Sequence, residues 1–177
     1  MVKPPLNYLD YIRNVPDFPK PGIVFRDITP LLANGDAFAA AVSEMACFVP
    51  DDADVVVGIE ARGFIFGAAL AYELNKGFVP IRKEGKLPAE TAKAEYALEY
   101  GLDRLEIHRD ALTSEHKAVI VDDLLATGGT AKAAAELVRK LGAEVAAFVF
   151  FIELTPLKGR EKLSGIAPVY AMLPLDD

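Results

Sequence analysis

Hydrophobic positions along the chain are gathered into short continuous runs separated by longer amphipathic segments. The runs are rich in β-branched and aromatic residues, which is typical of buried strands. They occupy residues 53–60, 77–83, 117–123 and 144–154. Apolar residues three and four positions apart predict helices at 61–75 and 130–143. Strands that are apolar throughout and alternate with helices predict an α/β fold, with a doubly wound, mainly parallel sheet and helices on both faces.

Two stretches depart from this pattern. Residues 6–15 predict a short helix closed by Pro16. Residues 83–104 are polar, contain Gly85 and Pro88 near their start, and then alternate between polar and apolar side chains as a hairpin does. We expect a flexible hairpin flap at 83–104 that departs from the core of the sheet.

A further helix is expected after residue 35. Asp36 stands where an N-cap residue would be, ahead of Phe38, Val42 and Met45 on one face. Cys47 lies at the end of the same apolar pattern, so we expect a small core residue rather than a nucleophile. It is the single cysteine of the chain and cannot form an internal disulfide, which predicts a reducing, cytoplasmic compartment.

Length and charge limit the classes of function. The 177 residues suffice for one compact domain with its own core, so we expect residues 1–177 to form a single domain. A net charge of -7 argues against nucleic acid as a partner, because phosphate backbones are held by basic patches. No apolar run has the length or composition of a membrane span or a signal peptide, so we expect no membrane partner.

Charged residues follow three of the predicted strands. They are Glu60 and Arg62 with Ala61 between them, then Arg82 and Lys83, then Asp122 and Asp123. In an open parallel sheet, ligands bind outside the carboxyl ends of the strands. These residues therefore predict a binding site at one edge of the sheet.

The segment after the third strand combines two opposite requirements. Residues 126–130 open a predicted helix, and their backbone N–H groups suit an anion at the positive end of the helix dipole. The same turn could serve only as a helix N-cap, with glycines needed for its shape. Asp122 and Asp123 repel a phosphate and suit hydroxyl groups or a cation instead. A sugar phosphate satisfies both parts, with its phosphate in the turn and its ribose hydroxyls on the aspartates.

Positive charge at this edge exceeds what one phosphate needs. Arg62, Arg82, Lys83 and Lys86 lie on other loops than the predicted phosphate turn. Any one of them taken alone is more simply a solvated surface residue. Their placement after strands predicts a second anionic group on the ligand.

The stretch VIVDDLLATGGT, residues 119–130, resembles the phosphoribosyl pyrophosphate motif of the type I phosphoribosyltransferases. Further segments resemble, in order and spacing, the members of that family that act on adenine. They are PDFPKPGIVFRDITPLL, GIEARGFIFG, IRKEGKLPAET, YALEYG and ELTPLKGREKL. The resemblance covers nearly the whole chain and implies the type I phosphoribosyltransferase fold, with residues 1–34 as an N-terminal hood.

The resemblance also implies an activity. The chain would be a pentosyltransferase of purine salvage that moves the 5-phosphoribosyl group of phosphoribosyl pyrophosphate to N9 of adenine, giving AMP and pyrophosphate. It would use Mg²⁺, held mainly through substrate oxygens with no direct protein ligand assigned. A cytoplasmic homodimer is implied as well.

The family pattern carries over to individual residues. Asp122 and Asp123 would hold the ribose hydroxyls. The phosphate turn would comprise Ala126, Thr127, Gly128, Gly129 and Thr130. Pyrophosphate would contact Glu60, Ala61, Arg62, Arg82, Lys83 and Lys86. The family often has Asp-Ser where Glu60-Ala61 stands, and a cis peptide is common there, which the sequence does not decide.

Adenine recognition would fall to the backbone of Val24, Phe25 and Arg26, with Phe25 and Leu124 as apolar walls. Backbone groups suit adenine, because guanine reverses its donor and acceptor pattern and would leave buried groups unpaired. Glu99 matches the acid/base residue of the family, with Tyr100 beside it on the flap, and would share a proton with the base.

Two other functions are compatible with parts of this pattern. A 6-oxopurine phosphoribosyltransferase would use the same sugar site, although VFRDITP and YALEYG disfavour it. A regulator that senses phosphoribosyl pyrophosphate and binds nucleic acid would need a basic face, against which the acidity of the chain speaks.

Overall fold

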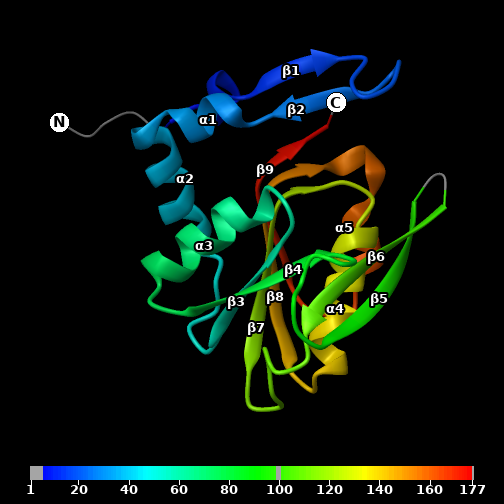
Figure 1. The fold of residues 1–177 in the computed structure, drawn as a ribbon. Coiled ribbons are helices and arrows are strands. Elements are labelled where there is room, and N and C mark those ends of the chain that lie inside the picture. Colours follow the sequence, from blue (N-terminus) through cyan, green and yellow to red (C-terminus); the bar gives the residue numbers. More distant parts are fainter. Residues whose placement is uncertain (1–5, 99–100, 177) are drawn as a thin grey trace. The chain divides into compact units, whose positions relative to one another are not determined.

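The computed structural model describes residues 6–98 and 101–176, which Figure 1 shows as a ribbon. The chain divides into two compact units, residues 1–43 and residues 44–177. Within the described ranges, no helix combines the length and the apolar character that crossing a membrane requires. The single domain expected from the chain length stays a prediction.

The N-terminal unit combines a β-hairpin with short helices (Figure 1). Its elements are η1 (Tyr8–Tyr11), β1 (Arg13–Pro16), β2 (Val24–Asp27), α1 (Thr29–Ala33) and most of α2 (Gly35–Ala46). The helix expected at 6–15 is wrong in its second half, because Arg13–Pro16 pair antiparallel with β2. The rings of Phe18 and Phe25 pack edge to face with centroids 5.3 Å apart, which supports the hairpin.

Polar side chains fix the starts of the helices in this unit. The Thr29 N–H donates to Asp27 Oδ1 at 2.9 Å at the start of α1. The Ala37 N–H donates to Asn34 Oδ1 at 3.0 Å, so Asn34 caps α2 and the expected cap, Asp36, does not. Asp36 lies in the first turn of α2, where its charge still complements the helix dipole.

Cys47 follows the last residue of α2 and is exposed. The expectation of a core residue is therefore wrong. The apolar helical pattern on which it rested ends at Ala46, whereas Met45 on the same helix is fully buried.

The C-terminal unit is built on a seven-stranded sheet with the order β5-β6-β4-β3-β7-β8-β9. Its strands are β3 (Val55–Ile59), β4 (Gly77–Lys83), β5 (Thr91–Leu98), β6 (Gly101–His108), β7 (Lys117–Leu125), β8 (Glu144–Leu154) and β9 (Val169–Leu175). The pairs β4-β3, β3-β7, β7-β8 and β8-β9 are parallel, and β6 pairs antiparallel with β4 and β5. The expected mainly parallel sheet is confirmed (Figure 1).

Helices cover both faces of this sheet. They are α3 (Gly63–Glu73), α4 (Gly129–Lys140), η2 (Thr155–Leu157) and α5 (Gly159–Leu163). Helix α3 packs against β3 and β7, and α4 packs against β5, β7 and β8. Every residue of β3 is buried. Alternate strand residues such as Val57 and Ile120 form one core cluster with Leu137 of α4, where each large apolar side chain contributes about 1.5–3 kcal/mol.

The hairpin expected between residues 83 and 104 is present and extends further. Strands β5 and β6 pair from Leu98↔Gly101 to Thr91↔His108. The β6 strand also joins β4 at Arg82↔Glu106. The predicted flap therefore has its stem built into the edge of the main sheet.

Candidate active site

A pocket of about 370 Å³ lies at the carboxyl ends of β3 and β7. Its walls come from Glu60, Ala61, Arg62, Tyr96, Asp122, Asp123, Leu124, Leu125, Ala126, Thr127, Gly128, Gly129, Thr130, Ala131 and Phe150. The structure thus brings together the predicted loop after β3, the two aspartates and the phosphate turn. Neighbouring parallel strands deliver their following residues to one edge, which explains the convergence.

The predicted phosphate turn connects β7 to α4. Gly128 has a φ of +78° and stands at the N-cap of α4, a backbone conformation that favours glycine. Within the described residues, no side chain caps this helix end, and its first turn contains no acidic residue. Free N–H groups and a positive helix end make the turn suitable for an anion.

The two aspartates occupy a desolvated position beside the turn. The Asp123 N–H donates to Asp122 Oδ1 at 2.9 Å. Burial raises the pKa of Asp122 well above its usual range, and the neighbouring charge of Asp123 raises it further. Burial also raises the pKa of Asp123, although the Arg62 guanidinium opposes this effect. Both carboxyl groups would therefore gain from additional donors or from a cation.

One carboxylate oxygen of this pair lacks a hydrogen bond. Asp123 is 4% exposed, and its Oδ2 lies 2.9 Å from Arg62 Nε without the geometry of a hydrogen bond. A buried acceptor of this kind is costly unless a donor reaches it. A ligand hydroxyl is a suitable donor.

The loop after β3 approaches Asp122 closely. The Glu60-Ala61 peptide is cis. A Cβ atom at Gly63 would lie 2.7 Å from Asp122 Oδ1 and 2.9 Å from the Val121 carbonyl oxygen. Only glycine allows helix α3 to begin this close to the end of β7.

Glu60 accepts hydrogen bonds from three of the four basic residues predicted for a second anion. Its Oε1 accepts from Arg82 Nη2 at 3.1 Å and from Lys86 Nζ at 3.0 Å. Its Oε2 accepts from the Lys83 N–H at 3.0 Å. Burial raises the pKa of Glu60, but these hydrogen bonds outweigh it and lower the pKa to about 2. The ionised Glu60 side chain therefore orients the Arg82 guanidinium and the Lys86 ammonium, whereas the Lys83 ammonium pairs with Asp103.

Tyr96 was missed by sequence reasoning. Its hydroxyl donates to Asp103 Oδ2 at 2.9 Å, and Lys83 Nζ lies 3.2 Å from the same oxygen. Burial and the bond to Asp103 raise the pKa of Tyr96 to about 12, so the phenol stays protonated. The alternation of 91–98 could have placed Tyr96 on the inner face of the hairpin with Ala92 and Ala94, but no local signal linked it to the pocket.

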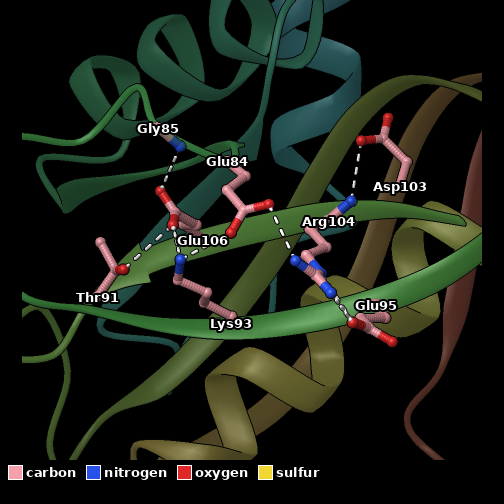
Figure 2. Close-up of polar contacts among 8 residues, drawn as sticks. All are labelled: Glu84, Gly85, Thr91, Lys93, Glu95, Asp103, Arg104 and Glu106. Carbon is pink, nitrogen blue, oxygen red and sulfur yellow. Dashed lines mark hydrogen bonds and ion pairs between the residues drawn. The ribbon is translucent and has the colours of Figure 1, made fainter.

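Figure 2 shows the charged side chains on the stem of the hairpin. Glu106 is 3% exposed and accepts hydrogen bonds from the Gly85 N–H at 3.0 Å and from Thr91 Oγ1 at 3.3 Å. Lys93 Nζ lies 3.1 Å from Glu106 and 2.7 Å from Glu84. These contacts join the turn after β4 to both strands of the hairpin.

The remaining predicted residues fall in other places. Val24, Phe25 and Arg26 form most of β2 in the N-terminal unit, whereas Leu124 lines the pocket. Glu99 and Tyr100 lie outside the described residues. Across the ranges 6–98 and 101–176, no group of three or more His, Cys, Asp or Glu side chains is arranged to hold a metal ion.

Known proteins resemble this chain in both sequence and structure. The model of the phosphoribosyl transferase domain matches residues 28–172. An adenine phosphoribosyltransferase from Halothermothrix orenii is 59% identical over 88% of this chain and 92% of its own length. The crystal structure of adenine phosphoribosyltransferase from Thermoanaerobacter pseudethanolicus superposes with a TM-score of 0.92 at 51% identity, covering 94% of this chain and 97% of that chain.

A further similar structure contains ligands. It is the adenine phosphoribosyltransferase of Saccharomyces cerevisiae complexed with D-2,5-dideoxy-2,5-imino-altritol 1,6-bisphosphate and adenine. It has a TM-score of 0.82 and 44% identity, over 93% of this chain and 96% of that chain.

Proposed function

The chain belongs to the phosphoribosyltransferase family, and on this premise we propose that it is an adenine phosphoribosyltransferase. It transfers the 5-phosphoribosyl group of phosphoribosyl pyrophosphate to N9 of adenine and releases AMP and pyrophosphate. The observation that carries the proposal is the pocket in which an uncapped, glycine-rich helix start adjoins two desolvated aspartates. The names of relatives at 51–59% identity support adenine as the base.

The proposed roles follow the chemistry of each group. The backbone of residues 126–130 binds the 5-phosphate at the start of α4. Asp122 and Asp123 accept hydrogen bonds from the ribose hydroxyls, and a hydroxyl at Asp123 Oδ2 would add a hydrogen bond to the ion pair with Arg62. Arg82, Lys83 and Lys86 bind the pyrophosphate, and Glu60 orients the side chains of Arg82 and Lys86.

The reaction replaces one bond at C1′ by another. The bond from C1′ to the pyrophosphate oxygen breaks with its electron pair on pyrophosphate, and N9 of adenine forms the new bond to C1′. The N9 proton must leave, and Glu99 is the proposed acceptor. The basic residues around Glu60 stabilise the negative charge that develops on the leaving pyrophosphate.

Adenine itself would be bound by the backbone of Val24, Phe25 and Arg26, with Phe25 and Leu124 against its ring. In this proposal the flap at 83–104, which carries Glu99 and Tyr100, excludes water from the reacting carbon. Hydrolysis of the sugar would otherwise compete with transfer to the base.

Mg²⁺ is the proposed cofactor. The buried carboxylate of Asp123 beside Asp122 in the pocket supports this proposal, because negative charge there suits a cation. Bound mainly through oxygens of phosphoribosyl pyrophosphate, the ion would neutralise charge on the leaving group. A cytoplasmic homodimer completes the proposal.

The direct test measures products. Purified protein is incubated with adenine, phosphoribosyl pyrophosphate and Mg²⁺, and AMP and pyrophosphate are quantified separately. We expect them in equal amounts, no reaction after chelation of the metal, and a lower kcat in a Glu99→Gln variant. Pyrophosphate release without AMP would contradict transfer and indicate hydrolysis instead.

A further inference from the structure

The segment after β8 contacts the predicted phosphate turn from behind. It contains η2 (Thr155–Leu157) and α5 (Gly159–Leu163), and Gly159 is buried. A Cβ atom at Gly159 would collide with the Ala126 carbonyl oxygen and would lie 3.0 Å from the Gly128 nitrogen. A Cβ atom at Gly128 would in turn lie 2.5 Å from the Gly159 carbonyl oxygen.

The two glycines therefore let two stretches of backbone touch with no side chain between them. Native interiors are packed without spare volume, so an added methyl group at Gly159 must displace the turn or the segment behind it. Because Ala126 and Gly128 belong to the turn itself, any displacement would change the positions of the N–H groups that face the pocket.

The segment is itself fixed to the sheet. Arg160 Nε donates to Glu153 Oε1 at 3.1 Å, and Arg160 Nη2 donates to Glu153 Oε2 at 2.5 Å. Arg160 Nη1 also donates to the Val169 carbonyl oxygen. A bidentate pair of this kind holds both position and orientation.

The anchor lies next to the turn. Glu153 is 5% exposed and pairs in register with Leu125, the last residue of β7. The buried carboxylate thus connects the strand that leads into the turn with the segment that supports it.

We propose that Gly159 is a positioning residue for the 5-phosphate group, and that the Glu153–Arg160 pair anchors it. Gly159 sets the position of the turn backbone through its contacts with Ala126 and Gly128, and so determines the affinity for a phosphorylated ligand. The inference rests on the proposed role of residues 126–130 and adds a residue from outside the pocket lining to it.

The test compares ligands with and without the phosphate. In Gly159→Ala we expect the KM for phosphoribosyl pyrophosphate and the Kd for AMP to rise by about 10- to 100-fold, since small misplacements in a preorganised site cost this much. The Kd for adenosine, which lacks the phosphate, and the KM for adenine should change by less than about twofold. Loss of affinity for adenosine and AMP alike would overturn the positioning role and indicate general disruption.

A matched control comes from Gly77 at the start of β4. A Cβ atom at Gly77 would lie 3.5 Å from Val55 Cγ2, an ordinary contact, so Gly77→Ala should leave every constant unchanged. Arg160→Lys keeps the charge but loses the bidentate geometry. Like Gly159→Ala, it should reduce the affinity for AMP more than the affinity for adenosine. If Gly159→Ala does not fold, the Arg160→Lys variant tests the proposal. An unchanged preference of this variant for AMP over adenosine would overturn it.

The wild-type protein separates the two claims. If it binds AMP no more tightly than adenosine, residues 126–130 do not bind phosphate and the proposed function of the turn fails. If it prefers AMP and the Gly159→Ala variant keeps the full preference, only the positioning role of Gly159 fails.

Discussion

At the scale of single residues, the charges of the pocket are tuned by their neighbours. Hydrogen bonds from its basic neighbours hold Glu60 as an anion, whereas burial disfavours the ionised forms of Asp122 and Asp123, and the charge of Asp123 disfavours that of Asp122 further. Acidic groups with opposite pKa shifts within one pocket are typical of functional sites. Substitution of Glu60 should therefore destabilise the fold at neutral pH, whereas substitution of Asp122 should stabilise it.

The first prediction concerns Glu60. Its pKa is lowered from 4.5 to about 2, so its ionised form stabilises the fold above about pH 4.5, and this contribution is lost as the pH falls towards 2. A Glu60→Gln variant should lose about 1–3 kcal/mol of unfolding free energy at pH 7, allowing for solvent around its partners. Urea denaturation at pH 7 and at pH 3 measures this. An equal loss at both values would contradict the assigned charge pairing.

The second prediction concerns Asp122. Because its pKa is raised in the folded state, its ionised form destabilises the protein at neutral pH, and the protein gains relative stability as the pH falls. Asp122→Asn should therefore raise the thermal unfolding midpoint at pH 7 while the KM for phosphoribosyl pyrophosphate rises about tenfold or more, through loss of a charge-assisted hydrogen bond. A lower midpoint with an unchanged KM would show that Asp122 is structural.

At the scale of elements, the stem of the hairpin depends on one buried carboxylate. Glu106 joins Gly85, Thr91 and Lys93, while most of the other charges in Figure 2 are exposed. A buried, hydrogen-bonded charge leaves its partners unsatisfied when it is removed, whereas an exposed ion pair contributes little.

The third prediction follows from this difference. Glu106→Gln should reduce the unfolding free energy by about 1–3 kcal/mol, because the Lys93 charge loses its buried partner. The matched control is Glu95→Gln, which removes an exposed pair with Arg104 and should cost less than about 0.5 kcal/mol. Guanidinium titrations of both variants measure their unfolding free energies. Equal losses would contradict the prediction that the buried carboxylate contributes more than the exposed one.

The elements also show which parts of the fold are encoded locally. The strands at 77–83, 117–123 and 144–154 were predicted because long apolar runs need no partner to be recognised. The pattern of residues 6–15 predicts a helix through most of β1, whereas β1 forms as a strand because it pairs with β2. Helix α5 has five residues, too few for a periodic signal, and β9 contains Pro174 and has a single buried residue, Leu175.

The residues of the candidate site also divide into those that the local sequence predicts and those whose contacts depend on the fold. The aspartates and the phosphate turn lie within twelve consecutive residues, so their spacing could be recognised in the sequence. Tyr96 and the ion pairs of Glu60 depend on strands that meet only in the folded sheet. The support of the turn by Gly159 is a contact between backbones, for which side-chain patterns carry no signal.

At the scale of the whole molecule, one surface of α3 is suited to self-association. Ile65 and Tyr72 are 39% and 89% exposed, and Ala68 between them is exposed as well. Their spacing of three, four and seven residues places them on one side of the helix. We expect this side to belong to the interface of the proposed homodimer.

The fourth prediction tests that interface. Tyr72→Glu should weaken dimerisation by about tenfold or more, because a charge would have to be desolvated at the interface, whereas Tyr72→Phe should leave it intact. Sedimentation equilibrium over a range of protein concentrations measures both. Dimers of unchanged affinity in the glutamate variant would exclude this side of α3 from the interface.

The choice of base tests the proposed function most directly. Initial rates are measured with adenine, hypoxanthine and guanine under identical concentrations of phosphoribosyl pyrophosphate and Mg²⁺. We predict a kcat/KM for adenine at least about 100-fold above the values for the other two bases, because a 6-oxopurine would leave buried donors and acceptors unpaired. Turnover with hypoxanthine or guanine but not adenine would contradict the proposed substrate. Tight binding of phosphoribosyl pyrophosphate without turnover of any base would contradict catalysis itself.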